Sequence, residues 1–242
     1  MKDYKTETKN RVDWIKRTLI QTGAKGIIFG NSGGKDSALV GILCKMATDE
    51  VLGVIMPCGS KQNYTSDKDD AVKLADKFGI NAMTIDLTDT REKLLEQLTA
   101  YAKITDIAKS NIAPRLRMTT LYAIGQTMGY LVAGTSNKSE YHMGYFTKWG
   151  DAGCDFNPIA DLTATEVFEF LEFLECPKEI INKAPSAGLF EGQTDEKEMG
   201  VTYAAIDKYI ETGQGKAEDI EIIQRAHKIT EHKRKLPLKF GE

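Results

Sequence analysis

The sequence predicts an α/β fold in which a mostly parallel, doubly wound sheet is flanked by helices. Short apolar segments rich in β-branched residues alternate with longer amphipathic segments, as in parallel strands joined by helical crossovers. The most informative stretch is 26–37, where an apolar run stops at Gly30, a glycine-containing turn follows, and a helical pattern begins near Asp36. A strand, a tight loop and a helix start in this order predict an anion site in a Rossmann-like sheet.

Length and composition favour one folded domain over residues 1–242. An apolar content of 41% can build a substantial core, and we find no repeat, low-complexity tract or linker. The first residues lack an apolar signal region, and no run approaches the roughly twenty apolar residues of a membrane span, so we expect a cytoplasmic protein. A net charge of −3 argues against a large nucleic-acid surface.

The four cysteines share no Cys-x-x-Cys spacing, which argues against a zinc site and against structural disulfides. We expect them to be small buried thiols. They are Cys44, Cys58, Cys154 and Cys176.

The N-terminal half is expected to hold six elements. In order, these are a helix over about 7–21, the strand ending at Gly30, the helix beginning near Asp36, a strand over 51–57, a helix opening at Thr65 or Ser66 and ended by Gly79, and a strand over 82–87. Gly23 gives the first helix a stop signal, and its apolar face consists of Val12, Ile15, Leu19 and Ile20. The run 51–57 is apolar throughout, as in a strand buried on both faces.

The C-terminal half is expected to add one strand and several helices. In order, these are a helix over about 90–103, a turn near Asn111, a helix over about 113–128, a strand over 131–135, an irregular segment over 144–158, a helix from Thr163 ended by Pro177, and short helices near 202–210 and 217–230. The polar stretch 183–199 is interpreted as a loop and a candidate lid, because long loops in compact domains are usually functional or mobile. A basic tail follows at 232–235.

The carboxyl ends of parallel strands meet at one edge of a sheet, so four segments are expected to converge on a ligand. They are 30–37, 57–60, 86–88 and 135–140. In the first, Ser32, Gly33 and Gly34 let backbone N–H groups approach an anion, and the helix dipole and Lys35 favour a phosphate. The loop is neither a Walker A motif nor Gly-x-Gly-x-x-Gly. The alternative is a simple turn in which Asp36 or Ser37 caps the helix.

Charged residues near these segments are further candidates. Arg115 and Arg117 lie about 200° apart around a helix, so one of them at most faces a site, and the alternative is that both are solvated. Asp36 and Glu140 together would suffice for Mg²⁺, which takes one or two carboxylates with phosphate oxygens and waters. Glu140 alone could instead be an exposed loop acid. His142 is expected to be a structural hydrogen bonder.

The loop Ser-Gly-Gly-Lys-Asp-Ser resembles the Ser-Gly-Gly-x-Asp-Ser loop of the ATP pyrophosphatase families, which cleave ATP between the α- and β-phosphates. Over nearly the whole chain, seven motifs also resemble bacterial ammonia-dependent NAD synthetases in order and spacing. These are 32–37, 115–118, 134–135 with Glu140, 144–151, 155–158, 183–186 and 230–233.

This resemblance implies a ligase of NAD biosynthesis with the ATP pyrophosphatase type of fold. ATP would adenylate the nicotinate carboxylate of deamido-NAD with release of pyrophosphate, and ammonia would then displace AMP. The implied ATP contacts are Gly30, Asn31, Ser32, Gly33, Gly34, Lys35, Asp36, Ser37, Thr135 and Ser186, and the implied Mg²⁺ ligands are Asp36 and Glu140. The implied deamido-NAD contacts are Arg115, Lys148, Asp155, His232 and Lys233, which selects Arg115 as the inward arginine. The family is a homodimer, and we expect the same here.

Two points concern the chemistry directly. Ammonia is mostly ammonium at neutral pH, so the second step needs a proton acceptor or a selective site, and Asp151 is our hypothesis for that role; otherwise it stabilises a turn. Where family members commonly have a lysine that contacts ATP, this chain has Ala164, and Lys35 in the variable position of the loop would partly compensate.

Two other classes remain open. The chain could be another ATP pyrophosphatase, such as a GMP synthetase-like or tRNA-thiolating enzyme, for which Cys58 would be the reactive thiol; we expect Cys58 to be structural. It could also be a non-catalytic adenine-nucleotide-binding module. Because one helix precedes the ATP loop, we expect ammonium rather than glutamine to serve as the nitrogen donor.

Overall fold

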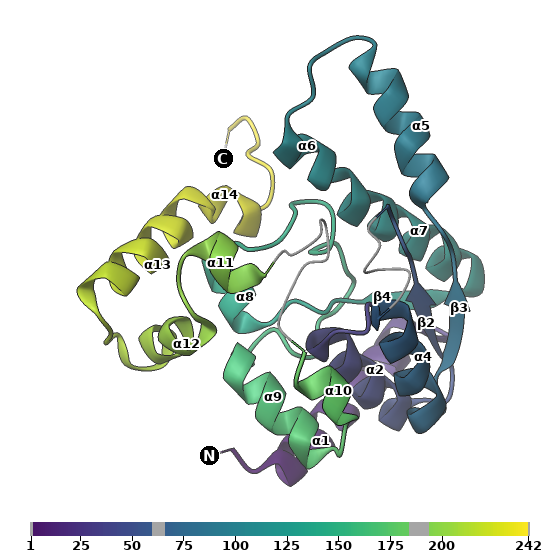
Figure 1. The fold of residues 1–242 in the computed structure, drawn as a ribbon. Coiled ribbons are helices and arrows are strands. Elements are labelled where there is room, and N and C mark those ends of the chain that lie inside the picture. The colour runs from purple at the N-terminus through teal and green to yellow at the C-terminus, as the bar shows by residue number, and fades with distance from the viewer. Residues whose placement is uncertain (1, 60–65, 184–193, 242) are drawn as a thin grey trace.

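One parallel sheet of four strands forms the centre of the chain in the computed structural model, which describes residues 2–59, 66–183 and 194–241 (Figure 1). The strand order is β3-β2-β1-β4. The strands are β1 Gly26–Gly30, β2 Val51–Ile55, β3 Asn81–Thr84 and β4 Tyr130–Ala133. All three strand pairs are parallel, which confirms the predicted α/β fold.

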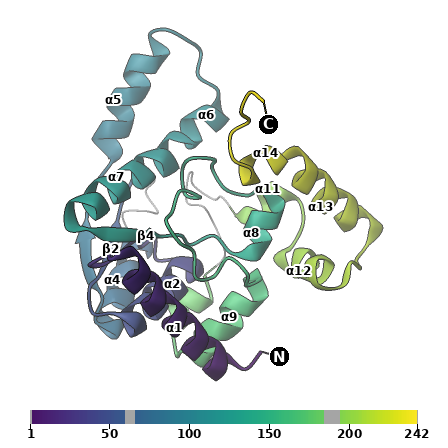
Figure 2. The ribbon, with the colours of Figure 1, turned by 180° about the vertical axis from the view of Figure 1, so that it is seen from behind.

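Helices cover both faces of the sheet. Successive side chains of a strand point to opposite faces, so β1 contributes to two apolar cores. Ile27 and Phe29 belong to a core that includes residues of the helices on one face, and Ile28 to a second core that includes residues of α7 on the other. The helices of the first core are α1 Tyr4–Thr22, α2 Lys35–Ala47, α4 Ser66–Phe78, α9 Ala164–Phe173 and α10 Lys178–Ile181. On the other face lies α7 Ile112–Met128, and α5 Thr88–Thr99 and α6 Asp106–Ser110 project beyond it (Figure 1). Figure 2 shows α1, α2 and α9 together from behind.

The C-terminal helices form a separate layer beside the sheet (Figure 1). They are α11 Asp195–Met199, α12 Tyr203–Thr212, α13 Ala217–Ile229 and α14 Glu231–Arg234. A third apolar cluster joins α11, α12 and α13 to α8 Lys138–Met143, and its buried members include Met143, Tyr203, Ile206 and Ile223. None of the described helices combines the length and apolarity needed to cross a bilayer.

The first helix is longer than expected and buries a narrower face. It begins at Tyr4 rather than near Glu7 because the Asp3 carboxylate accepts hydrogen bonds from the next backbone N–H groups, as an N-cap does. Gly23 ends it, as predicted. Val12 and Ile15 are buried and Leu19 packs against the same core, but Ile20, expected on the same face, is 80% exposed.

Other boundaries depart from the sequence-based expectation. The third strand ends at Thr84 rather than Leu87, and short helices α6 and α8 were not expected. The helix from Thr163 ends at Phe173, and Pro177 instead precedes α10 as its N-cap. The expected loop 183–199 is wrong in its last five residues, which form α11, and its part 184–193 lies outside the described residues.

The cysteines occupy the environments expected of structural thiols. Cys44, Cys58 and Cys176 are buried, Cys154 is half-buried, and all four are free. Burial raises the pKa of the Cys58 thiol, which makes the thiolate scarce at neutral pH. This property supports a structural role for Cys58.

The contact between α8 and α13 contains a stacked pair of imidazoles. The rings of His142 and His227 lie 4.2 Å apart between centroids, and the Nε2 of His142 is buried with no partner among the described residues. Burial, and next the nearby His227, Arg234 and Lys138, lower the pKa of His142 to about 4. Its neutral form is therefore the one that fits the fold.

We expect this histidine to make the protein sensitive to acid. In the unfolded chain the pKa of His142 has its ordinary value of 6.5. The contribution of the neutral ring to the free energy of unfolding is therefore complete above pH 6.5 and is lost as the pH falls through the folded pKa of about 4. Because the ring is only half-buried, we expect a loss of about 1 kcal/mol in the free energy of unfolding. Denaturant unfolding should show that the free energy of unfolding falls less between pH 7 and pH 4 in His142→Phe than in the wild type. The same decrease with pH in both proteins would refute the prediction.

Candidate active site

A cavity of about 840 Å³ opens at the carboxyl end of the sheet. It is bounded by the loop after β1, the end of β2 at 54–57, the end of β4 at 132–136, the segment 144–153 and parts of α6, α7 and α11. Three of the four predicted segments therefore converge. The segment 86–88 after β3 does not line the cavity, because β3 is the outermost strand on its side of the sheet.

The glycine loop has the shape of an anion cradle. Gly33 has φ +73°, and a Cβ there would lie 2.2 Å from the carbonyl oxygen of Asp67, so only glycine fits. The hydroxyl oxygens of Ser32 and Ser37 lie 3.0 Å apart, and Ser37 Oγ donates to the carbonyl of Gly34. The loop thus closes on itself and directs the N-terminus of α2 toward the cavity.

Asp36 does not cap α2. Gly34 is the N-cap residue and Asp36 lies in the first turn, which rules out the alternative interpretation of this carboxylate. One of its oxygens, Oδ1, accepts a hydrogen bond of 3.0 Å from Asn137 Nδ2. The carboxylate is therefore turned toward the loop after β4.

Asn137 also fixes Glu140. Its backbone N–H donates to Glu140 Oε2 at 3.1 Å, and its Oδ1 accepts from the backbone N–H of Glu140 at 3.0 Å, which is a complete capping box at the start of α8. Asn137 thus holds both predicted metal carboxylates, one through its side chain and one through its main chain. It is fully buried.

Lys35 lies between these two carboxylates rather than in the open cradle. Its Nζ contacts Asp36 Oδ2 and lies 3.8 Å from Glu140 Oε1. Burial lowers the pKa of Lys35, but Asp36 and Glu140 outweigh that effect and raise the pKa above its ordinary value. Burial, and next Asp36, raise the pKa of Glu140 well above its ordinary value, and Lys35 opposes them. The site therefore favours a bound cation.

The predicted Mg²⁺ ligands are a pair of carboxylates, Asp36 and Glu140. Within residues 2–59, 66–183 and 194–241, no three His, Cys, Asp or Glu side chains are arranged to hold a metal ion. Two hard oxygen donors, each with its second oxygen fixed by Asn137, fit an ion that completes its coordination with phosphate oxygens and waters.

Asp151 lines the cavity from a tight turn. Its Oδ1 accepts a hydrogen bond of 2.9 Å from the backbone N–H of Thr147, so it also stabilises that turn, and Trp149 inside the turn has φ +59°. Burial raises the pKa of Asp151, while the hydrogen bonds from Thr147 oppose the shift. A carboxylate with a raised pKa is the better proton acceptor near neutral pH.

The basic tail packs against the same turn. Lys233 Nζ donates to the carbonyls of Gly144 and Phe146, each at 2.8 Å, and lines the cavity. Lys148 Nζ donates to the carbonyl of His232 at 2.6 Å. The side chain of His232 is exposed and does not line the cavity. The tail is thus held at the mouth of the site by main-chain contacts.

The arginine pair is oriented opposite to the expectation. Arg117 lines the cavity and its Nε donates to the carbonyl of Met56 at 3.1 Å, whereas Arg115 is exposed and donates to the carbonyl of Lys148 at 3.3 Å. The prediction that Arg115 is the inward arginine of its own chain is wrong. Arg117 follows Pro114 by three residues and precedes Leu121 by four, so it lies on the buried stripe of α7.

The remaining predicted residues differ in how close they lie to the cavity. Thr135 lines it. Asp155 does not, because its Oδ2 accepts from Val132 N–H at 2.8 Å and its Oδ1 from the Tyr122 hydroxyl at 3.1 Å. Ser186 lies outside the described residues. Ala164 is fully buried, and its backbone N–H donates to Ser139 Oγ at 3.0 Å. A larger side chain at this position would therefore require the surrounding residues to rearrange.

Several residues that line the cavity or lie directly behind its wall were missed by sequence reasoning. Asn137 could have been found, because Asn-x-x-Glu is a helix-start signature. Lys183 Nζ bridges Asp67 and Asp70, 2.7 Å from each, and Asp195 accepts a hydrogen bond of 2.9 Å from the Tyr203 hydroxyl. The Lys183 contacts join segments more than a hundred positions apart and have no local signal, whereas Asp195 and Tyr203 are separated by eight positions across the end of α11.

We expect Asn137→Ala to lower both the free energy of unfolding and the catalytic activity. Loss of the cap should lower the free energy of unfolding by about 1 kcal/mol. Asp36 loses its side-chain partner and the start of α8, which carries Glu140, loses its cap, so kcat/KM should fall by about tenfold to a hundredfold. Thr163→Ala is the matched control, because Thr163 forms the same capping box on α9 without holding a cavity carboxylate. Equal losses of activity in both variants would contradict the positioning role of Asn137.

Comparison with known proteins gives the family. The family model described as NAD synthase matches residues 7–237. The chain belongs to the NAD synthase family. An NH(3)-dependent NAD(+) synthetase from Carboxydothermus hydrogenoformans is 44% identical over 238 residues, which is 97% of this chain and 97% of that relative. The resemblance inferred from the seven motifs is thereby confirmed.

Solved structures of NAD synthase relatives agree with the fold. An NMN synthetase from Francisella tularensis covers all of both chains with a TM-score of 0.94 and 37% identity. An NH3-dependent NAD synthetase from Campylobacter jejuni has a TM-score of 0.82 and 28% identity over 99% of this chain and all of that one. The α/β fold and the ligase class expected from the sequence are those of this family.

Proposed function

We propose that this NAD synthase catalyses the ATP-dependent amidation of deamido-NAD to NAD with ammonia. The carboxylate oxygen of the nicotinate attacks the α-phosphorus of ATP, the α–β phosphoanhydride bond breaks, and pyrophosphate leaves. Ammonia then attacks the adenylated carbonyl carbon, AMP leaves with the bonding electrons, and the amide remains. The observation that carries the proposal is that the glycine loop, the Asp36–Glu140 pair and Asp151 line the same cavity.

Residues around the glycine loop support the first step. The backbone of Ser32–Ser37 and the N-terminus of α2 would hold the phosphates, and Thr135, which lines the same cavity, would contact the nucleotide. Asp36 and Glu140 would hold Mg²⁺, which would neutralise charge on the departing pyrophosphate. Gly30, Asn31 and Ser186 remain proposed ATP contacts.

Asp151 supports the second step. Its buried carboxylate, with a raised pKa, would accept the proton that ammonium or the attacking nitrogen must lose. Lys233 lies near enough to interact electrostatically with Asp151, so the tail would orient the acyl group beside the base.

The dinucleotide contacts include residues outside this cavity. Arg115, Lys148, Asp155, His232 and Lys233 remain the proposed deamido-NAD contacts, although Arg115, Lys148, Asp155 and His232 do not line the cavity of one chain. This arrangement supports a homodimer in which the substrate lies near the subunit interface. We also propose that residues 1–242 act as one catalytic domain in the cytoplasm, where ATP and dinucleotide are available.

Pyrophosphate release tests the proposal. With ATP and Mg²⁺ present, release should require deamido-NAD, and NAD should form with ammonium but poorly with glutamine. Binding of ATP without turnover would instead indicate a non-catalytic nucleotide module. Release that depends on xanthosine monophosphate or tRNA would indicate one of the other ATP pyrophosphatases.

One observation favours a second substrate, nicotinate mononucleotide. The solved structure with a TM-score of 0.94 over both full chains is an NMN synthetase by name, and the same amidation on the mononucleotide would give NMN. The same assay, run with deamido-NAD and nicotinate mononucleotide in parallel, ranks the two substrates by kcat/KM. A preference for the mononucleotide would reassign the substrate and leave the chemistry unchanged.

A further inference from the structure

The loop lysine, Lys35, is placed as a cation for the two carboxylates rather than as a ligand for phosphate. Its side chain is only 5% exposed. Its ammonium contacts Asp36 Oδ2 and lies 3.8 Å from Glu140 Oε1. It therefore bridges two side chains that come from different strand ends, α2 after β1 and α8 after β4.

The carboxylate oxygens that face Lys35 are the ones a shared metal ion would need. Asn137 holds the opposite oxygens, Asp36 Oδ1 at 3.0 Å and Glu140 Oε2 at 3.1 Å. Mg²⁺ lies about 2.0–2.1 Å from each ligand oxygen. An ammonium and a metal ion cannot both occupy the gap between Asp36 Oδ2 and Glu140 Oε1, so one must leave when the other binds.

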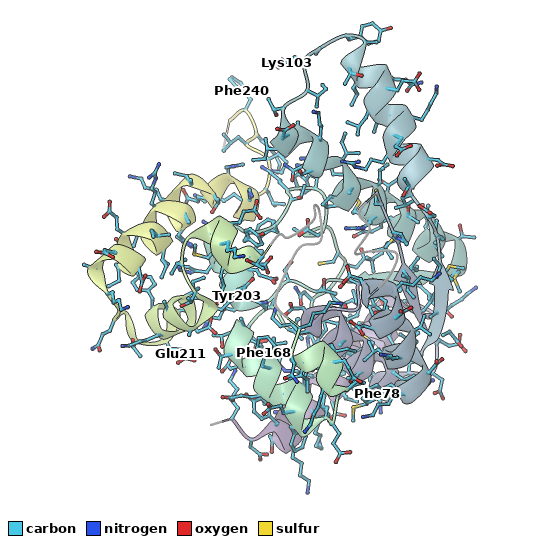
Figure 3. The ribbon with its side chains drawn as sticks, viewed as in Figure 1. Phe78, Lys103, Phe168, Tyr203, Glu211 and Phe240 are labelled. Carbon is cyan, nitrogen blue, oxygen red and sulfur yellow. The ribbon has the colours of Figure 1, made fainter. Side chains whose placement is uncertain are left out.

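Two aromatic rings lie within cation–π range of the ammonium where it contacts Asp36. Lys35 Nζ lies 5.6 Å from the ring centroid of Phe168 on α9 and 5.4 Å from that of Tyr203 on α12. Figure 3 labels the two aromatic residues. Such distances allow cation–π attraction, and Asp195, which accepts from the Tyr203 hydroxyl, adds a negative charge on that side. A small rotation of the flexible lysine stem would move the charge toward the rings without exposing it to water.

We propose that Lys35 is a built-in counterion that fills the cation position between Asp36 and Glu140 until a divalent ion, arriving with the nucleotide, displaces it toward Phe168 and Tyr203. The proposal rests on the proposed function, in which these two carboxylates are the metal ligands. Its consequence is an order of binding. The free enzyme binds metal weakly because the metal must displace a resident charge, and phosphates of ATP add ligands that make the exchange favourable.

Metal titration without nucleotide tests the exchange. Isothermal titration of the protein with MnCl₂ should show affinity at least about tenfold higher in Lys35→Met than in the wild type, because the competing charge is gone while the apolar stem is kept. Lys138→Met is the matched control: Lys138 is exposed on α8, two residues before Glu140, and its loss removes the same charge. Its affinity should equal that of the wild type.

Two further variants make the outcome decisive. Lys35→Arg keeps the charge and should bind Mn²⁺ as weakly as the wild type. Lys35→Met with Asp36→Asn should lose the gained affinity, which assigns the gain to this site. Circular dichroism and thermal unfolding verify that each variant is folded.

The results that would overturn the proposal are distinct from those that would overturn the function. Equal or weaker Mn²⁺ binding in folded Lys35→Met, tight binding in Lys35→Arg, or a gain that survives Asp36→Asn would each reject the exchange. The metal site itself is tested separately, by measuring Mn²⁺ affinity in the presence of ATP. Asp36→Asn in the otherwise wild-type enzyme should weaken this binding, and unchanged binding would reject Asp36 as a metal ligand.

Discussion

Asp36→Asn is expected to lower the rate of NAD formation by about a thousandfold while leaving the fold intact. The asparagine keeps the size of the side chain and an oxygen that can accept from Asn137 Nδ2, so the contact between α2 and α8 survives. What is lost is the negative charge that would hold the cation beside the departing pyrophosphate. Pyrophosphate release at saturating ATP and deamido-NAD measures the effect.

A charge-matched variant separates this effect from a general change in electrostatics. Asp49 follows the other end of α2, is exposed, and pairs with Lys45, so Asp49→Asn removes the same charge far from the cavity. Its activity should stay within twofold of the wild type, which is about the effect of a screened surface charge. Retention of more than a tenth of the activity by Asp36→Asn would remove Asp36 from the proposed metal site.

Asp151→Asn is expected to lower the turnover number with ammonium by about a hundredfold at neutral pH, because the proton acceptor is lost while the hydrogen bond from Thr147 remains. The deficit should shrink as the pH rises toward 9, since more of the substrate is then already ammonia. Steady-state rates of NAD formation across this pH range check the prediction.

The adenylation step provides the internal control for Asp151. In a single turnover without ammonium, pyrophosphate release should be as fast in Asp151→Asn as in the wild type, because this step does not need the base. A deficit that is independent of pH, or equal losses in both steps, would contradict the role of Asp151 as a base. Asp151 would then only stabilise the turn, through the hydrogen bond that it accepts from Thr147.

Local signals in the sequence were sufficient for the sheet and the loop. The alternation of apolar runs with helical patterns predicted the parallel sheet, and the glycines after β1 predicted an anion loop, but the close approach of Gly33 to Asp67 was not visible in the sequence. The meeting of Asp36 with Glu140 followed from topology, since both lie just after neighbouring strands. Helices of four to six residues, such as α8 and α14, carry too few turns to leave a periodic pattern.

Residues whose partners are distant in the chain could not be placed from the sequence. Lys35 was expected to face phosphate, but the carboxylates it meets are fixed by Asn137, about a hundred positions away. Asp155 was expected at the substrate, but the sequence held no signal that its carboxylate accepts a hydrogen bond from the backbone of β4, at Val132. The orientation of Arg117, in contrast, was available from its place on the buried stripe of α7 and was missed in favour of motif similarity.

The projecting pair of α5 and α6 has a consequence for how the chain holds its shape. Neither helix contains a buried residue, all four residues of β3 are exposed, and Lys103 lies in the connection at the far tip (Figure 3). A helix of this length gains little stability by itself in water. In a lone chain, the amide hydrogens of α5 should therefore exchange with solvent long before those of β1. If that exchange slows as the protein concentration rises, a second copy of the chain supplies the missing contacts, and the dilution at which protection disappears gives the strength of the dimer.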